Sequence, residues 1–133
     1  IKKGFGVKMI VILLALFVGL QFAIRLWPLP DVPWSGGDVE AGTGERTVLS
    51  GYYSQSDAVS FDQLKARLIA TSGLHILRET PTLVAVYRSR VWGFPDIIEL
   101  WVDAGVVHIR GNSVLGISDL GSNKKRIKSW LMP

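Results

Sequence analysis

An uncharged apolar run near the start of the chain limits what the chain can fold into. Between Met9 and Ile24 the only polar side chain is the amide of Gln21. A helix rising ~1.5 Å per residue spans roughly 24 Å over this run, and the flanking apolar residues from Phe5 to Trp27 extend it toward the ~30 Å of a bilayer core. The sequence therefore predicts a transmembrane anchor within residues 1–27.

A cleavable signal peptide is the alternative, since it shares the basic start and the apolar middle. Such a peptide ends in small residues at its processing site. The best-placed alanine, Ala23, has Gln21 two positions before it, which fits that pattern poorly. An anchor is therefore the preferred interpretation.

The distribution of charge predicts an orientation for this anchor. The chain has 15 Lys and Arg against 11 Asp and Glu, and the excess comes from Lys2, Lys3, Lys8 and Arg25. Three of these residues precede the span and one follows it, so the positive-inside rule places the N-terminus in the cytoplasm. The rest of the chain then lies across the membrane, in a periplasm or lumen. Because that part is neutral, nucleic-acid binding is not expected.

Residues 28–46 are predicted to form a tether between the anchor and a domain over residues 47–133. Prolines at positions 28, 30 and 33 favour a stiff exit from the bilayer, and glycines from Gly36 onward loosen the chain. Tryptophans at positions 27 and 34 are of the type that settles at the headgroup level.

Two amphipathic helices are expected in the domain. Ser60 and Gln63 fit a capping box, Gly73 stands where a C-terminal cap belongs, and the apolar face consists of Phe61, Leu64 and Leu68. Ser118 or Ser122 is expected to cap a closing helix. Its apolar face would consist of Leu120, Ile127 and Leu131, with Trp130 beside it.

Strands are predicted over residues 47–53, 74–79 and 83–87, followed by a hairpin around Ala104-Gly105. With that two-residue turn, the hairpin pairs Leu100 with Ile109 and Val102 with Val107 on one face. The other face carries the pairs Glu99 with Arg110 and Trp101 with His108.

A four-residue loop over 93–96 is expected to bring the preceding strand alongside. This loop places Arg90 opposite Glu99 and Arg88 opposite Trp101. Two rows result, one of Arg90, Glu99 and Arg110 and one of Arg88, Trp101 and His108. The predicted fold class is α+β: an N-terminal transmembrane helix, then a two-layer sandwich of a mainly antiparallel sheet with two helices on one face.

Short polar and glycine motifs are concentrated in the last third of the chain. They are Ser89-Arg90, Phe94, Asp96, Glu99, Arg110, Ser113, Gly116, Ser118-Asp119-Leu120-Gly121, Asn123 and Lys125-Arg126. This pattern resembles a bacterial and plastid family known as domain of unknown function 1499. The chain departs from that family at Ile97, where the family tends to have a second aspartate, and at Val114, where it has an arginine. The resemblance implies a family but no activity.

The arginine rows allow two interpretations. They form either a charge ladder on an open sheet face or a site for an anion or an acidic partner, since guanidinium groups beside one carboxylate keep donors free. The candidate site residues are Arg88, Arg90, Glu99, Trp101 and Arg110.

The basic run near the C-terminus also has two interpretations. It is either a solvated helix face or a contact for anionic headgroups or an acidic subunit. Its residues are Lys124, Lys125, Arg126 and Lys128.

Catalytic and metal chemistry find little support in the sequence. The chain has no cysteine, and His75 and His108 lack neighbouring ligands at metal-binding spacing, so neither a metal nor a cofactor is expected. Ser113 lies in a stretch that only superficially resembles a nucleophile elbow, because Leu115 replaces the second glycine.

The expected function is therefore that of a non-catalytic, single-span membrane protein. Its domain would act as an interaction module or accessory subunit of a larger membrane complex, with a respiratory or photosynthetic assembly as one candidate host. Membrane lipids and other membrane-protein subunits are the expected partners. The alternative is a membrane-tethered module that binds a lipid or a small anionic ligand.

Overall fold

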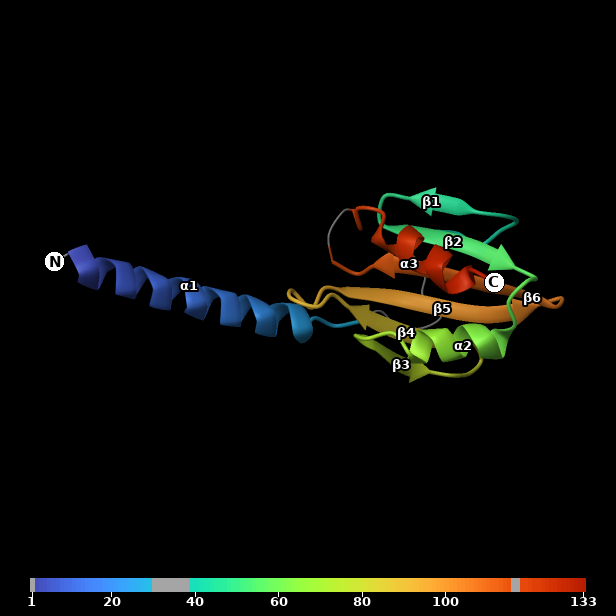
Figure 1. The fold of residues 1–133 in the computed structure, drawn as a ribbon, viewed down its shortest axis with the longest axis horizontal. Helices are drawn as coiled ribbons and strands as arrows, with labels where there is room; N and C mark the ends of the chain where they lie inside the picture. Colours follow the sequence, from blue (N-terminus) through green and yellow to red (C-terminus); the bar gives the residue numbers. More distant parts are fainter. Residues whose placement is uncertain (1, 30–38, 116–117) are drawn as a thin grey trace.

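The computed structural model describes residues 2–29, 39–115 and 118–133. Figure 1 shows one long helix standing out from a compact sheet and helix domain. In chain order the elements are α1 (Lys2–Arg25), β1 (Arg46–Val48), β2 (Gly51–Ser56), α2 (Phe61–Ile69), β3 (Leu74–Arg78), β4 (Leu83–Arg88), β5 (Pro95–Asp103), β6 (Val106–Ser113) and α3 (Ser122–Leu131).

The strands form one six-stranded antiparallel sheet in the order β1-β2-β6-β5-β4-β3, and both short helices lie on one side of it (Figure 1). Leu64 and Leu68 of α2 and Ile127 and Trp130 of α3 share a buried cluster with sheet residues such as Leu100. We call the sheet face under these helices the first face and the opposite one the second face. The predicted α+β arrangement is confirmed.

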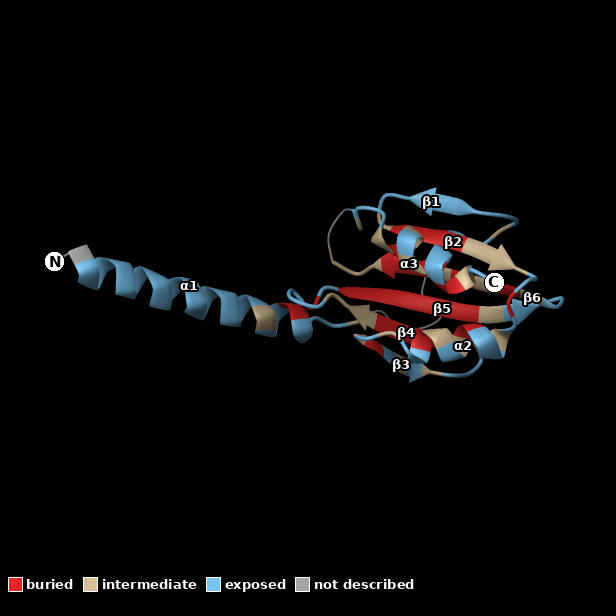
Figure 2. Ribbon diagram, in the orientation of Figure 1, coloured by how far each residue is buried: buried red, intermediate tan, exposed pale blue. Residues whose placement is uncertain are grey.

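The helix α1 is exposed along nearly its whole length, as Figure 2 shows. Its segment Lys3–Arg25 is long and apolar enough to cross a membrane. Near the domain, only Ile24 of this helix is buried among the described residues. A bilayer would cover the apolar side chains that water contacts along the rest of α1.

The hairpin of β5 and β6 has the predicted register. Glu99 pairs with Arg110, Leu100 with Ile109, and Trp101 with His108. Leu100 and Ile109 are buried in the cluster under the helices, so the predicted inward face is confirmed.

The predicted register of β4 against β5 is wrong. Glu99 lies opposite Val84, and Arg88 lies opposite Pro95. The connection runs from residue 89 to residue 94 and so lies earlier in the chain than the expected loop, because β4 ends at Arg88 and β5 already begins at Pro95, a position that proline tolerates. Arg90 therefore lies in the connection, and the two predicted arginine rows do not exist in that form.

The segment before the sheet differs from the expected single strand. Residues 46–56 form a hairpin of β1 and β2 rather than one strand over 47–53. Ahead of it, Val39 is 1% exposed, and its N–H lies 3.3 Å from the side-chain oxygen of Asn112. This part of the predicted tether therefore packs on the second face; residues 30–38 of the tether lie outside the described residues.

The helix caps agree with the sequence in one case and differ in the other. The capping box of Ser60 and Gln63 is present in α2, although this helix ends at Ile69 and Gly73 lies in the following turn. The N-cap residue of α3 is Gly121, which has no side chain to accept a bond, and the Asp119 carboxylate accepts hydrogen bonds from Gly121 N–H (2.8 Å) and Asn123 N–H (3.3 Å). Neither predicted serine is that cap.

The apolar face of α3 also differs from the prediction. Ile127 and Trp130 are buried, whereas Leu120 is 94% exposed and precedes the helix. Gly111 explains how closely α3 approaches the sheet, because a Cβ at this position would lie 2.4 Å from the Asn123 Oδ1 atom.

Candidate functional site

Most of the motif residues found in the sequence line one pocket of about 500 Å³. It lies where β4 ends, β5 begins, β6 ends and α3 begins. We call it the motif pocket; it is lined by Tyr87, Ser89, Arg90, Phe94, Asp96, Ser113, Leu115, Ser118, Asp119, Leu120, Ser122 and Arg126. The sequence pattern identified most of these residues, but not that they lie together.

Asp96 and Arg126 form the charged wall of the motif pocket. Arg126 Nη1 lies 3.2 Å from Asp96 Oδ2 and also donates to Asn123 Oδ1 at 3.2 Å. The Arg126 guanidinium stacks on the Tyr87 ring, with its carbon 3.7 Å from the ring centroid. Arg126, predicted as a headgroup contact, is therefore held inside the domain.

Burial controls the ionisation of Asp96. Desolvation raises the pKa of this carboxyl, and the charge and hydrogen bond of Arg126 only partly oppose that effect. The nearby Asp119 carboxylate raises the pKa further, while a hydrogen bond from Ser113 lowers it. The pocket therefore contains a carboxylate whose charge is costly to maintain.

The loops around the motif pocket are held by hydrogen bonds of its serine side chains. Ser89 Oγ accepts from Phe94 N–H at 3.0 Å, and this bond closes the turn between β4 and β5. Ser113 Oγ donates to the Leu115 carbonyl oxygen at 2.6 Å. The serine hydroxyls therefore fix the shape of the pocket wall.

Arg90 is the exposed basic residue of the motif pocket. Within the described ranges no carboxylate pairs with it, whereas Arg126 already has Asp96. A guanidinium group presents several N–H donors in a fixed plane, which suits carboxylate or phosphate oxygens. Beside Arg90, the pocket wall includes the apolar side chains of Phe94, Leu115 and Leu120. The pocket thus offers a charged group and an apolar surface to one ligand.

The second face of the sheet holds three other predicted site residues. Glu99 is 4% exposed, and its Oε1 atom lies 3.1 Å from Arg110 Nη2. The Arg110 guanidinium carbon lies 5.5 Å from the centroid of the Trp101 ring. These residues form a largely covered cluster, so the expectation of an open charge ladder is wrong.

Trp101 extends this cluster toward solvent through stacked rings. The Trp101 and His108 rings stack with centroids 5.4 Å apart, and the Tyr53 hydroxyl lies 2.5 Å from His108 Nδ1. The Tyr53 hydroxyl also donates to the Gly42 carbonyl oxygen at 2.7 Å. Trp101 and His108 remain half-buried.

Arg88 lies apart from both groups, at the junction of α1 with the domain. Its guanidinium donates to the carbonyl oxygens of Arg25 (3.2 Å) and Gly93 (3.1 Å). Burial lowers its pKa, and the nearby Arg25 charge lowers it further. The structure therefore divides the predicted site into Arg90 in the motif pocket, Arg88 at the junction, and Glu99, Trp101 and Arg110 on the second face.

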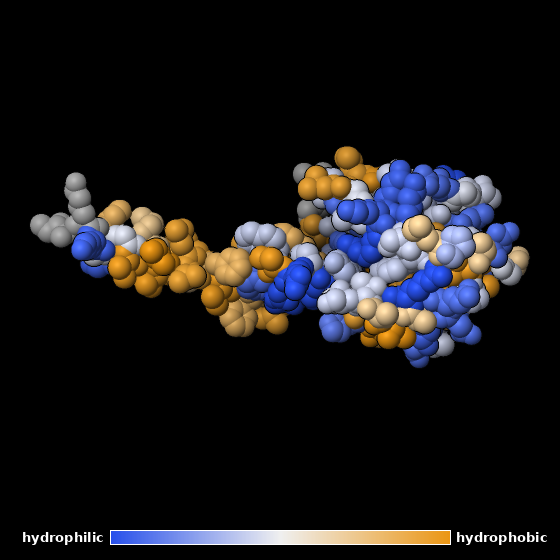
Figure 3. Space-filling model, in the orientation of Figure 1, coloured by the Kyte–Doolittle hydropathy of each residue, from blue (hydrophilic) through white to orange (hydrophobic). Residues whose placement is uncertain are grey.

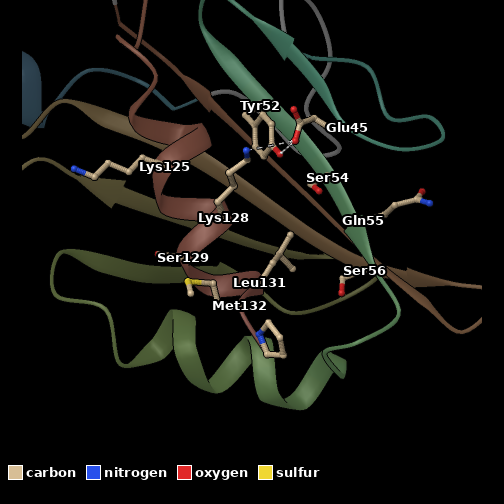
Figure 4. A pocket seen from close by; sticks show the side chains of 11 residues that line it. Glu45, Tyr52, Ser54, Gln55, Ser56, Lys125, Lys128, Ser129, Leu131 and Met132 are labelled. Atoms are coloured by element: carbon tan, nitrogen blue, oxygen red, sulfur yellow. Dashed lines mark hydrogen bonds and ion pairs between the residues drawn. The ribbon is translucent and has the colours of Figure 1, made fainter.

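Lys125 and Lys128 of α3 border a groove of about 700 Å³ between this helix and β2, shown in Figure 4. Tyr52 donates to Glu45 Oε2 at 2.5 Å, and Lys124 and Lys128 lie 3.8 and 3.9 Å from the same carboxylate. The bond from Tyr52 lowers the pKa of Glu45, while burial and Glu45 raise the pKa of Tyr52 to about 12. The Lys125 side chain points away from the Glu45 carboxylate (Figure 4).

The two departures from the family pattern fall together, away from the motif pocket. Ile97 is fully buried on the second face with Val84 and Val86, and Val114 packs against the same cluster. An acidic and a basic position of the pattern are thus both apolar here. The described residues contain no cluster of three or more His, Cys, Asp or Glu side chains.

Comparison with known proteins gives one match. The sequence profile of the family described as "Protein of unknown function (DUF1499)" matches residues 39–132. No curated protein and no solved structure matches the chain. The matched span begins at the buried Val39 and includes the motif pocket, the groove and the second face.

Proposed function

The chain belongs to the DUF1499 family, and from this membership we propose that it is a membrane-anchored binding module whose motif pocket takes the anionic head of an amphiphilic ligand. One observation carries the proposal. Most residues of the sequence pattern line a single pocket, at the end of the domain from which α1 emerges.

The lining of the motif pocket supports an amphiphile over a small polar ion. Arg90 offers free guanidinium donors at the rim, and Phe94, Leu115 and Leu120 offer apolar contacts. A ligand with one anionic group and an acyl or aromatic body satisfies both kinds of surface. A bilayer supplies such ligands next to the end of α1.

The proposal includes a topology. We infer that α1 spans the membrane with its N-terminus in the cytoplasm and the domain on the other side, in a periplasm or lumen. The support is the length and apolar character of the segment Lys3–Arg25, together with the basic residues Lys2, Lys3 and Lys8 at the N-terminal end of α1.

An accessory subunit of a larger membrane complex is the second candidate function. The half-buried stack of Trp101 and His108 on the second face favours it, because aromatic side chains are enriched at the centres of protein interfaces. Stoichiometric protein partners without bound lipid would support this candidate against the first.

The test is to measure the lipid that purifies with the full chain in mild detergent, for the wild type, Arg90→Gln and Arg46→Gln. Arg46 is an exposed arginine on the edge strand β1, away from the motif pocket, and serves as the matched control. A charge-assisted hydrogen bond contributes about 1.5–3 kcal/mol, so Arg90→Gln should retain roughly tenfold less anionic amphiphile. Equal lipid content in all three proteins would refute the proposal.

A further inference from the structure

We propose that the turn between β4 and β5 docks the domain on an anionic phospholipid bilayer, with Val91 and Trp92 among the lipids and the guanidinium groups of Arg25 and Arg88 on lipid phosphates. We call residues 89–94 the docking turn. The inference goes beyond the proposed function, because this surface meets the bilayer whether or not the motif pocket holds a ligand.

The docking turn lies against the side of α1. The rings of Trp92 and Phe17 meet edge to face with their centroids 5.5 Å apart. Trp92 also stacks with Phe94, at 6.3 Å between centroids. An aromatic cluster thus joins the turn to a helix that is itself long and apolar enough to span a membrane.

The position of this contact along α1 sets the depth of the turn. Phe17 precedes Arg25 by roughly two helical turns, which is about 12 Å along the axis. Arg25 is the basic residue that ends the apolar segment, so its charge belongs at the headgroup level. The Trp92 ring reaches from there toward the apolar segment, and tryptophan is enriched at this interfacial level.

Contacts of Arg88 and Arg25 hold the docking turn at this position along α1. The guanidinium of Arg88 bonds the last carbonyl of α1, that of Arg25, and the Gly93 carbonyl of the docking turn. The Arg25 guanidinium packs so closely on Gly93 that a Cβ there would lie 2.7 Å from its central carbon. These contacts hold the turn beside the helix.

Exposure and charge indicate what covers this surface. Val91 is 62% exposed and Trp92 is 43% exposed, although both are apolar and Trp92 lies beside Phe17 of α1. Arg25 and Arg88 are close enough for mutual repulsion, and no carboxylate pairs with either in the described part of the chain. Figure 3 shows hydrophilic surface gathered where the orange helix meets the domain. Lipid chains would cover the exposed apolar side chains of Val91 and Trp92, and lipid phosphates would pair with Arg25 and Arg88 at the headgroup level.

Depth is measured with single cysteines, since the chain has none of its own. The full chain with Val91→Cys, labelled with a nitrobenzoxadiazole fluorophore, is placed in nanodiscs whose lipids carry a nitroxide quencher. Asp103→Cys, exposed at the far hairpin, is the matched control. The lipid quencher should act at least threefold more strongly at position 91 than at position 103, and aqueous iodide should act in the opposite order.

The arginines are tested by comparing phosphatidylglycerol with phosphatidylcholine nanodiscs. Phosphatidylglycerol should increase lipid quenching at position 91, and Arg88→Gln and Arg25→Gln should each remove that increase, whereas Arg46→Gln should keep it. If Arg88→Gln fails to fold by circular dichroism, Arg25→Gln carries the test, because Arg25 lies outside the sheet.

Three results would overturn the inference. Equal lipid quenching at positions 91 and 103 would show that the turn does not dock. Equal quenching in both lipids would refute the role of the arginines. A label at position 91 shielded from both quenchers would show that a protein partner, not lipid, covers the turn.

Discussion

At the scale of single residues, Asp96 is where burial and charge pairing compete most directly. Burial raises its pKa above the ordinary 3.8 despite the ion pair with Arg126. The protonated form is therefore favoured by folding, and the stability that it contributes is present below pH 3.8 and lost as the pH rises through the raised pKa. At neutral pH, ionisation of Asp96 therefore lowers the free energy of unfolding relative to the protonated form.

We predict that the wild type loses stability relative to Asp96→Asn as the pH rises from about 3.5 to 7. The asparagine variant stays neutral and so lacks this loss. The check is the difference in free energy of unfolding in detergent, with Asp57→Asn at an exposed position as the control. The opposite trend would mean that attraction to Arg126 outweighs burial.

At the scale of the sheet, burial of the pair of Glu99 and Arg110 on the second face increases the effect that removing one partner has on the free energy of unfolding. Removing one partner of a buried pair costs more than removing one partner of an exposed pair. Glu99→Gln should therefore lower the free energy of unfolding by about 1–3 kcal/mol. The Glu79 carboxylate, which is 60% exposed and lies 2.7 Å from Lys65, is the matched control.

Glu79→Gln should lower the free energy of unfolding by less than about 0.5 kcal/mol, because solvent screens exposed pairs. Chemical denaturation of both variants followed by circular dichroism makes the comparison. Equal losses would show that solvent reaches the second face and that the pair is an open ladder after all.

The same strands show what the sequence can and cannot predict. The register of β5 against β6 follows from the two-residue turn at Ala104-Gly105, because a short turn leaves few pairings that bury one face. The connection between β4 and β5 is longer, and nothing local indicates that Pro95 begins a strand. The register of β4 against β5 is shifted by an even number of residues. Arg88 therefore stays on the predicted face of the sheet but lies opposite Pro95 instead of Trp101.

The sequence predicts most residues of the candidate site but not that they lie together in one pocket. The pattern from Ser89 to Arg126 contains most of the lining of the motif pocket. That lining comes from two loops, three strand ends and a helix, and their coming together depends on tertiary packing that no local sequence pattern indicates. Tyr87, which holds Arg126, was missed because it reads as an ordinary strand residue.

At the scale of the whole molecule, the domain is joined to α1 more closely than the predicted tether implies. Arg88 bonds the last turn of α1, and Val39 returns to the second face of the sheet. The motif pocket and the docking turn consequently share the end of the domain nearest α1. The proposed functions of both depend on which side of the membrane this end faces.

We predict that the N-terminus of α1 lies in the cytoplasm and the domain on the other side of the membrane. Three lysines lie before the apolar segment of α1 and Arg25 alone ends it, so the N-terminus should remain in the cytoplasm. In spheroplasts of a bacterial host, Asp103→Cys should react with a membrane-impermeant maleimide added from outside, and Lys3→Cys should react only after the membrane is opened. Labelling in the reverse order would place the domain in the cytoplasm. The docking turn would then contact the inner leaflet, because its contacts with α1 do not depend on topology.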